Sequence, residues 1–209
     1  MDNQLKKIAV FASGRGSNFI KIYENIKRGE IPAEICCLIT DNPSAAAIDF
    51  SNSENMPVFV VRPKDFTDST AFGAELLKIL NNLKVEWIVL AGYLKMIPPN
   101  VVVAFSNKIV NIHPALLPAF GGKGMYGMYV HEAVLKSGAK ISGVTVHLVN
   151  EIYDSGPIVM QRSVDIESCI CAEDIARAVL KVEHVIYSEA VKRLLTRPFH
   201  ISLNKVIFE

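Results

Sequence analysis

The sequence predicts an α/β protein with a Rossmann-like, mostly parallel twisted sheet and helices on both faces of that sheet. Two observations lead to this fold class. Apolar segments of strand length alternate with segments whose apolar residues recur at helical spacing. The strand-length segments are also apolar throughout, which is typical of parallel strands that crossover helices cover on both sides.

The expected elements follow one another along the chain. Gly29 suits the end of a first helix, Asp41-Asn42-Pro43 suits the turn that closes the second strand, and Ser44 suits the N-cap of the second helix. Strands or extended segments are expected at 7–12, 34–40, 58–61, 86–91, 108–112, 143–148 and 157–165. Helices are expected at 17–28, 45–53, 68–83, 128–136 and 173–195.

Length and charge restrict the class of protein. The chain has 209 residues, half of them hydrophobic, and a formal net charge of +1. We expect one domain over 1–209, with a first lobe at 1–105 and a second at 106–209. The balanced charge argues against a nucleic acid or an anionic membrane as partner. The first apolar run is too short for a signal peptide or a membrane span, so a cytoplasmic protein is expected.

The cysteines predict no metal centre. There is no CxxC pair and no nearby pair of histidines to complete a zinc site. Reduced thiols that act as small core residues are the expected state of all four, Cys36, Cys37, Cys169 and Cys171.

A glycine-rich segment, SGRGSN at residues 13–18, follows the first expected strand and opens the first expected helix. Glycine lets the backbone approach a ligand closely, and the start of a helix offers free N–H groups to an anion. A plain strand-to-helix turn with Ser17 as N-cap is the alternative. The context favours a phosphate site formed by Gly14, Arg15, Gly16, Ser17 and Asn18.

Two other nucleotide motifs fit less well. Gly14 and Gly16 match a dinucleotide fingerprint, but Phe19 stands where the third glycine belongs. Asp41 lies where a ribose-binding acid would follow the second strand, although it also suits a turn. A Walker loop is excluded because Gly124, not Ser or Thr, follows the Gly-Lys pair.

The segment NIHPALLP, residues 111–118, carries the first candidate catalytic residues. Asn111 and His113 are two apart at the end of an apolar strand, so their side chains point to the same face. An amide can donate to a developing oxyanion, and an imidazole can donate a proton or a charged hydrogen bond. The alternative is that both side chains satisfy backbone groups in a proline-rich turn.

Asp154, in the Asp-Ser-Gly-Pro turn at residues 154–157, is the third candidate. An acid near His113 would complete a set suited to acyl transfer to an amine. An ordinary turn-forming Asp explains the residue equally well. His147 on an expected strand either faces the same site or belongs to the core.

These motifs together resemble the folate-dependent formyltransferases. The resemblance rests on SGRGSN, AGYLKMIP at 91–98, NIHPALLP and the later D-S-G-P, and it covers residues 6 to 195. It implies the formyltransferase fold, with phosphate binding in the first lobe and catalysis and folate binding in the second. Within the group, the glycine-rich segment SGRGSN points to the enzymes that formylate glycinamide ribonucleotide in de novo purine biosynthesis.

The resemblance also implies roles for individual residues. Asn111, His113 and Asp154 match the catalytic residues, with His113 protonated, and the phosphate would lie against Gly16, Ser17 and Asn18. Glu183 matches a substrate-binding acid on the last helix, together with Gly14 and Arg15 of the loop. The residues that match the lining of the family's folate pocket are Leu94, Lys95, Met96, Ile97, Asn111, Asn150 and Tyr153.

The implied reaction uses 10-formyltetrahydrofolate as a co-substrate, with no metal and no tightly bound cofactor. Methionyl-tRNA, sugar-nucleotide and hydrolytic relatives share parts of the motif set, and a non-catalytic phosphate-binding module is the alternative from another class. Small molecules are the expected partners of a monomer or homodimer. The glycine-rich segment at 120–129 is either a flap over the site or a tolerated insertion.

Overall fold

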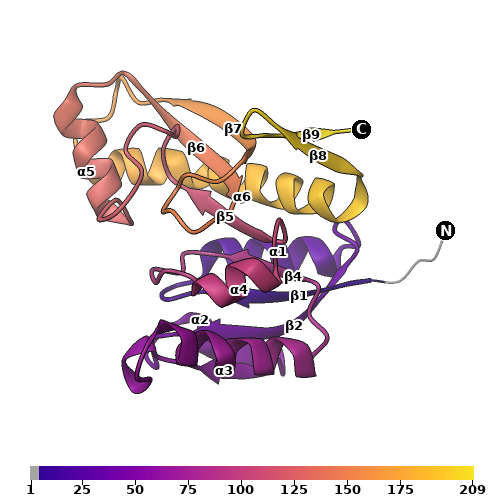
Figure 1. The fold of residues 1–209 in the computed structure, drawn as a ribbon. Coiled ribbons are helices and arrows are strands. Elements are labelled where there is room, and N and C mark those ends of the chain that lie inside the picture. Colours follow the sequence, from indigo (N-terminus) through magenta and orange to yellow (C-terminus); the bar gives the residue numbers. More distant parts are fainter. Residues whose placement is uncertain (1–4) are drawn as a thin grey trace. The chain divides into compact units, whose positions relative to one another are not determined.

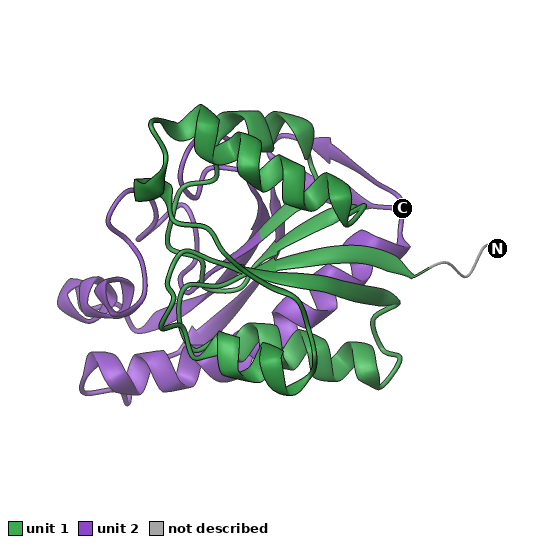
Figure 2. Cartoon of the chain, turned by 90° about the horizontal axis from the view of Figure 1, so that it is seen from below, with its two compact units in different colours: residues 1–110 green, residues 111–209 purple. Residues whose placement is uncertain are grey.

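The computed structural model describes residues 5–209 and divides into two compact units, Met1–Val110 and Asn111–Glu209 (Figure 2). Helices and strands alternate through most of both units (Figure 1). The single domain with lobes at 1–105 and 106–209 stays a prediction. Within residues 5–209, no helix is long and apolar enough to cross a lipid bilayer.

Unit 1 is a parallel sheet with helices on both of its faces (Figure 2). Its strand order is β3-β2-β1-β4. The elements are β1 (Lys6–Phe11), α1 (Ser17–Lys27), β2 (Ala33–Thr40), α2 (Ala47–Ser53), β3 (Val58–Val60), the short 3-10 helix η1 (Pro63–Asp65), α3 (Ser69–Asn82), β4 (Trp87–Leu90) and α4 (Pro99–Ala104).

The core of unit 1 explains why its strands read as unbroken apolar runs. In β1, the side chains from Ile8 to Phe11 are fully buried although they alternate between the two faces of the sheet. Helix α1 buries Phe19 and Ile22. Each such apolar side chain contributes about 1.5–3 kcal/mol on burial. The expected mostly parallel, doubly covered sheet is confirmed.

The order of the strands in unit 1 reverses at β1. The chain runs from β1 to β2 and β3 on one side, and then crosses to β4 on the other. Consequently the loops that follow β1 and β4 lie next to each other, and the Ser13 N–H donates to the Gly92 carbonyl at 3.1 Å. Such a switch point at the carboxyl ends of parallel strands is a usual ligand-binding position.

Unit 2 mixes parallel and antiparallel pairs. The pair β6–β7 and the hairpin β8–β9 are antiparallel, whereas β7 and β9 are parallel. Helix α6 packs against β6 and β7, and α5 packs against α6. The elements are the end of β5 (Ile109–His113), then α5 (Met128–Ser137), β6 (Ile141–Leu148), β7 (Ile158–Asp165), α6 (Ala172–Thr196), β8 (Phe199–Ser202) and β9 (Lys205–Phe208).

The structure corrects several local predictions. Helix α4 and the hairpin β8–β9 were not expected. Ser44 does not cap α2, because its N–H donates to the side chain of Asn42 and the helix begins only at Ala47. The remaining predicted elements are present, with ends that differ by one or two residues.

Candidate functional site

The polar centre of unit 2 forms where β5 ends. Strand β5 closes with Asn111, Ile112 and His113, so its apolar alternation leaves two polar side chains on one face. His113 is 3% exposed, which is unusual for a titratable side chain. A buried imidazole needs partners, and the loops after β5 and β6 supply them.

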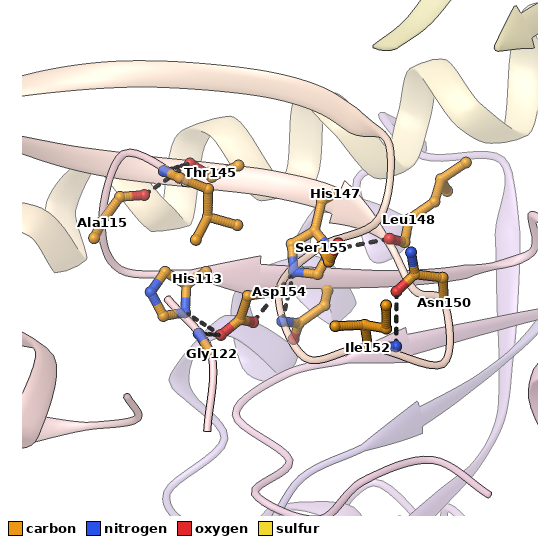
Figure 3. A network of polar contacts seen from close by, with 12 residues as sticks. His113, Ala115, Gly122, Thr145, His147, Leu148, Asn150, Ile152, Asp154 and Ser155 are labelled. Carbon is orange, nitrogen blue, oxygen red and sulfur yellow. Dashed lines mark hydrogen bonds and ion pairs between the residues drawn. The ribbon is translucent and has the colours of Figure 1, made fainter. Parts of the chain in front are cut away.

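Asp154 joins two histidines (Figure 3). Its Oδ2 lies 3.5 Å from Nδ1 of His113 and accepts a hydrogen bond from the Gly122 N–H at 2.8 Å. Its Oδ1 lies 3.6 Å from Nε2 of His147. The carboxylate therefore contacts the strand that carries His113, the strand that carries His147 and the glycine-rich segment at 120–129.

The surroundings of His113 determine its protonation. Nε2 faces the Phe120 carbonyl oxygen at 2.8 Å, so this nitrogen carries a hydrogen. Burial lowers the pKa of His113 below its usual value, although the charge of Asp154 and the Phe120 carbonyl act in the opposite direction. The ligand-free protein at pH 7 therefore favours the neutral ring, and protonation of His113 during the reaction stays a prediction. Once the ring gains a proton, both nitrogens face acceptors.

Asp154 is held as a carboxylate. Burial acts to raise its pKa, but the hydrogen bond with His147, the charge of His113 and the Gly122 N–H together hold the pKa below its usual value. An ionised Asp154 gives His113 a nearby negative charge that favours proton uptake. The pair is consequently suited to accept a proton during a reaction and to release it afterwards.

His147 fixes the orientation of Asn111. Its Nδ1 lies 2.9 Å from the Leu148 carbonyl oxygen and must donate to it, so in the neutral ring Nε2 is an acceptor. Nδ2 of Asn111 lies 3.1 Å from that Nε2 and donates to it when the ring is neutral, whereas a hydrogen on Nε2 would instead point to Oδ1 of Asp154. The second hydrogen on the amide nitrogen remains able to donate to a further acceptor, such as an oxyanion. Of the two alternatives for His147, a residue that faces the site or a core residue, these contacts favour the first.

Two glycines permit the loops around Asp154 to approach so closely. A Cβ on Gly156 would overlap the Leu148 carbonyl oxygen. A Cβ on Gly121 would overlap the Leu117 side chain and lie 3.2 Å from Cβ of Asp154. The turn at residues 154–157 therefore needs its glycine for the close approach of two backbone segments.

Three polar residues near the catalytic candidates were missed by sequence reasoning. The hydroxyl of Thr145 donates to the Ala115 carbonyl at 2.7 Å and accepts from the Leu117 N–H at 2.9 Å. Nε2 of Gln161 donates to Thr145 and to the Leu117 carbonyl, at 2.9 and 3.0 Å. His131 is buried on α5, and the charge of His113 helps burial to lower its pKa. A threonine two residues before His147 on an apolar strand was the available signal.

The glycine loop (residues 13–18) lies in unit 1. Gly16 has φ +70°, and a Cβ there would lie 2.9 Å from Cβ of Ala47, so both conformation and space require glycine. Helix α1 begins at Ser17 with Gly16 as its cap and without a side-chain capping bond. The alternative of Ser17 as N-cap is therefore wrong, and the first N–H groups of α1 suit an anion. Gly14 and Arg15 are exposed, whereas Asn18 is buried.

The other predicted binding residues lie on both units. In unit 1, Leu94, Lys95 and Met96 are exposed and Ile97 is buried. In unit 2, Asn150 accepts from the Ile152 N–H at 3.0 Å, Tyr153 is exposed, and Glu183 is half-buried on α6. The structure brings Asn111, His113 and Asp154 together, while the binding roles stay predictions.

Metal ligation has no candidate in the described part of the chain. Among residues 5–209, no three His, Cys, Asp or Glu side chains gather in a way that could hold a metal ion. All four cysteines are free thiols, and burial raises the pKa of Cys37 to about 12. The buried thiol is therefore protonated at neutral pH, as a small core residue would be.

Comparison with known proteins gives the family. The model of the family described as formyl transferase matches residues 6–191. A chloroplastic phosphoribosylglycinamide formyltransferase of Arabidopsis thaliana is 45% identical over 89% of this chain and 64% of the relative. Phosphoribosylglycinamide formyltransferase of Bacillus subtilis is 38% identical over 91% of this chain and 95% of the relative.

Solved structures agree with this result. Glycinamide ribonucleotide transformylase 1 of Symbiobacterium toebii superimposes with a TM-score of 0.92 at 31% identity, over 100% of this chain and 95% of that one. The chain spans 64% and 61% of the lengths of the Arabidopsis thaliana and Vigna unguiculata relatives. The resemblance inferred from the motifs is confirmed, and the chain belongs to the formyl transferase family.

Proposed function

We propose that this protein transfers a formyl group from 10-formyltetrahydrofolate to the amine of glycinamide ribonucleotide, in de novo purine biosynthesis. The observation that carries the proposal is the carboxylate of Asp154, which faces His113 on one side and His147 on the other. Family relatives that bear the names of this activity support the choice of substrates.

The proposed reaction begins when the substrate amine attacks the formyl carbon, forming a C–N bond and a tetrahedral oxyanion. The free N–H of the Asn111 amide donates to that oxyanion, and the positive charge that His113 carries after proton uptake stabilises it. Since the attacking nitrogen becomes cationic, a proton must leave it while N10 of the folate gains one.

Asp154 assists this transfer through His113 or through an ordered water. The intermediate then collapses as the bond between the formyl carbon and N10 breaks, which gives the formylated amide and tetrahydrofolate. Neither oxidation nor reduction occurs. The formyl folate is a co-substrate, and the proposal needs no tightly bound cofactor and no metal.

Substrate binding is assigned to segments of both units. Gly14, Arg15, Gly16, Ser17 and Asn18 would hold the phosphate at the start of α1, with Glu183 as a further substrate contact. Leu94, Lys95, Met96, Ile97, Asn111, Asn150 and Tyr153 would contact the folate. A cytoplasmic location, and a monomeric or homodimeric state, remain expectations.

An absorbance assay of folate release tests the proposal. Purified protein is given 10-formyltetrahydrofolate with and without glycinamide ribonucleotide. We expect tetrahydrofolate only in the presence of the ribonucleotide. Release without the ribonucleotide would contradict a transferase and indicate a hydrolase, and no release in either sample would contradict both.

A further inference from the structure

Asp41 has no role in the proposed reaction, although its place after β2 first suggested a ribose-binding acid. Its side chain is only 9% exposed. A buried carboxylate is costly unless hydrogen bonds or opposite charges compensate it. The partners of Asp41 therefore indicate what the residue does.

Both oxygens of Asp41 are engaged within unit 1. Oδ1 accepts a hydrogen bond from the Ser13 hydroxyl at 2.5 Å, and Oδ2 lies 3.6 Å from Nζ of Lys95. Each oxygen thus already has a partner within unit 1, which is typical of a carboxylate with a structural role. Ser13 opens the glycine loop, whereas Lys95 belongs to the segment 94–97 after β4.

The Ser13 hydroxyl, which donates to Asp41, also accepts a hydrogen bond from the segment 94–97. A hydroxyl has a single hydrogen, and here it points at Asp41, so only the lone pairs of Oγ remain for other partners. The Leu94 N–H donates to that Oγ at 2.9 Å. The result is a directed chain from the Leu94 N–H through Ser13 to an ionised carboxylate, in which each bond polarises the next.

Further hydrogen bonds join the loops around Ser13 and Asp41. The Asn42 side-chain amide donates to the Ser13 carbonyl at 3.1 Å, and the Ser13 N–H donates to Gly92. Burial raises the pKa of Tyr93, and the negative charge of Asp41 adds to that effect. Three loops, those after β1, β2 and β4, therefore meet at the Ser13 side chain and backbone.

We propose that Asp41 is a positioning residue that holds the glycine loop and the segment 94–97 in one arrangement through the hydroxyl of Ser13. The inference rests on the proposed function, in which the first of these segments binds the phosphate and the second binds the folate. Loss of the charge on Asp41 should then weaken the binding of both substrates. Lys95 offsets a negative charge that would otherwise lie beside a phosphate-binding loop.

Hydrogen exchange on the ligand-free protein tests the structural part. We expect Asp41→Asn and Ser13→Ala to speed exchange in peptides that contain the Leu94 N–H and the glycine loop by about tenfold, because a charged hydrogen bond is lost or weakened. Asp49→Asn removes the same charge from an exposed position on α2 and should leave these peptides unchanged. Unchanged exchange at Leu94 in both variants, or acceleration spread evenly over unit 1, would overturn the proposal.

Steady-state kinetics tests the consequence for binding. Asp41→Asn should raise KM for the ribonucleotide and for the formyl folate by about tenfold each, with kcat within about threefold of wild type. Because both residues act through one chain of hydrogen bonds, the double variant with Ser13→Ala should bind no worse than the worse single variant. A rise in only one KM, or a fall in kcat alone, would overturn the positioning role. If wild type transferred no formyl group, the proposed function would fail, and exchange at Leu94 would still decide the role of Asp41.

Discussion

Two carboxylates of this protein are buried to nearly the same extent, but the side chains that contact them differ in whether they change protonation near neutral pH. Asp41 in unit 1 is 9% exposed and pairs with a hydroxyl and a lysine. Asp154 in unit 2 is 11% exposed and pairs with two imidazoles and a backbone N–H. Lysine and serine keep their protonation states across the working pH range, whereas histidines change theirs.

This difference separates a structural role from a chemical one. A carboxylate between groups of constant charge can hold two loops in place at any physiological pH. A carboxylate between two histidines can follow a proton that moves during a reaction. Substitution of Asp41 should therefore change mainly KM, and substitution of Asp154 should change mainly kcat.

Asp154→Asn gives the largest expected effect. The amide keeps the size of the side chain but removes the charge that favours proton uptake by His113. We expect kcat to fall by about 10²–10⁴, the usual effect of losing a group in proton transfer. Single-turnover rates of Asp154→Asn and Asp41→Asn, measured side by side, provide the check. Equal rates in the two variants would contradict the chemical role of Asp154 and the structural role of Asp41.

Asn111→Ala should have a somewhat smaller effect. It removes the amide N–H proposed for the oxyanion and leaves Nε2 of His147 without its donor. The loss of one oxyanion donor lowers kcat by about 10²–10³. Isothermal titration should find nearly unchanged ribonucleotide binding. A variant in which KM rises while kcat stays constant would show that Asn111 binds substrate only.

Ser17→Asp tests the glycine loop of unit 1. A negative charge at the first position of α1 would repel a phosphate there, so ribonucleotide affinity should fall by about 10–100-fold. Folate binding should survive, which equilibrium titration with each ligand measures separately. An equal loss for both ligands would indicate damaged folding and would remove the support for a phosphate site.

The pH dependence of stability should show the smallest effect. The pKa of His113 is depressed in the folded protein, so its neutral form contributes stability that is complete above the ordinary value of 6.5 and is lost as pH falls through the folded value. Asp154 also has a depressed pKa, and its contribution is lost only below its ordinary value of 3.8. Denaturant titrations should therefore show His113→Gln flattening the slope below pH 6.5, and a wild-type slope in the variant would contradict this assignment.

The sequence predicted those parts of the molecule that depend on local pattern. Continuous apolar runs indicated buried parallel strands, and the two-residue spacing of Asn111 and His113 indicated a shared face at the end of a strand. The glycines at 16 and 156 stood in motifs because other chain segments come too close for a side chain. These features have local signals because backbone conformation and side-chain alternation are local properties.

Other features have no such signal. Helix α4 has only six residues and begins at Pro99, directly after its N-cap Pro98. The turn of the β8–β9 hairpin places Leu203 and Asn204 at positive φ, where glycine is usual. The partners of Asp41 lie 28 and 54 residues away in the chain, and those of Thr145 lie 16, 28 and 30 residues away, so spacing could not reveal them. The depressed pKa of His113 likewise depends on burial, which only the fold determines.

His113→Ala tests the central claim most directly, because the claim makes this imidazole a catalytic group rather than a binding one. The measurement is single-turnover formyl transfer from 10-formyltetrahydrofolate to glycinamide ribonucleotide, together with the affinity for each substrate. We predict affinities within about threefold of wild type and a rate lower by about 10²–10⁴. A near-normal rate in the folded variant would contradict the account.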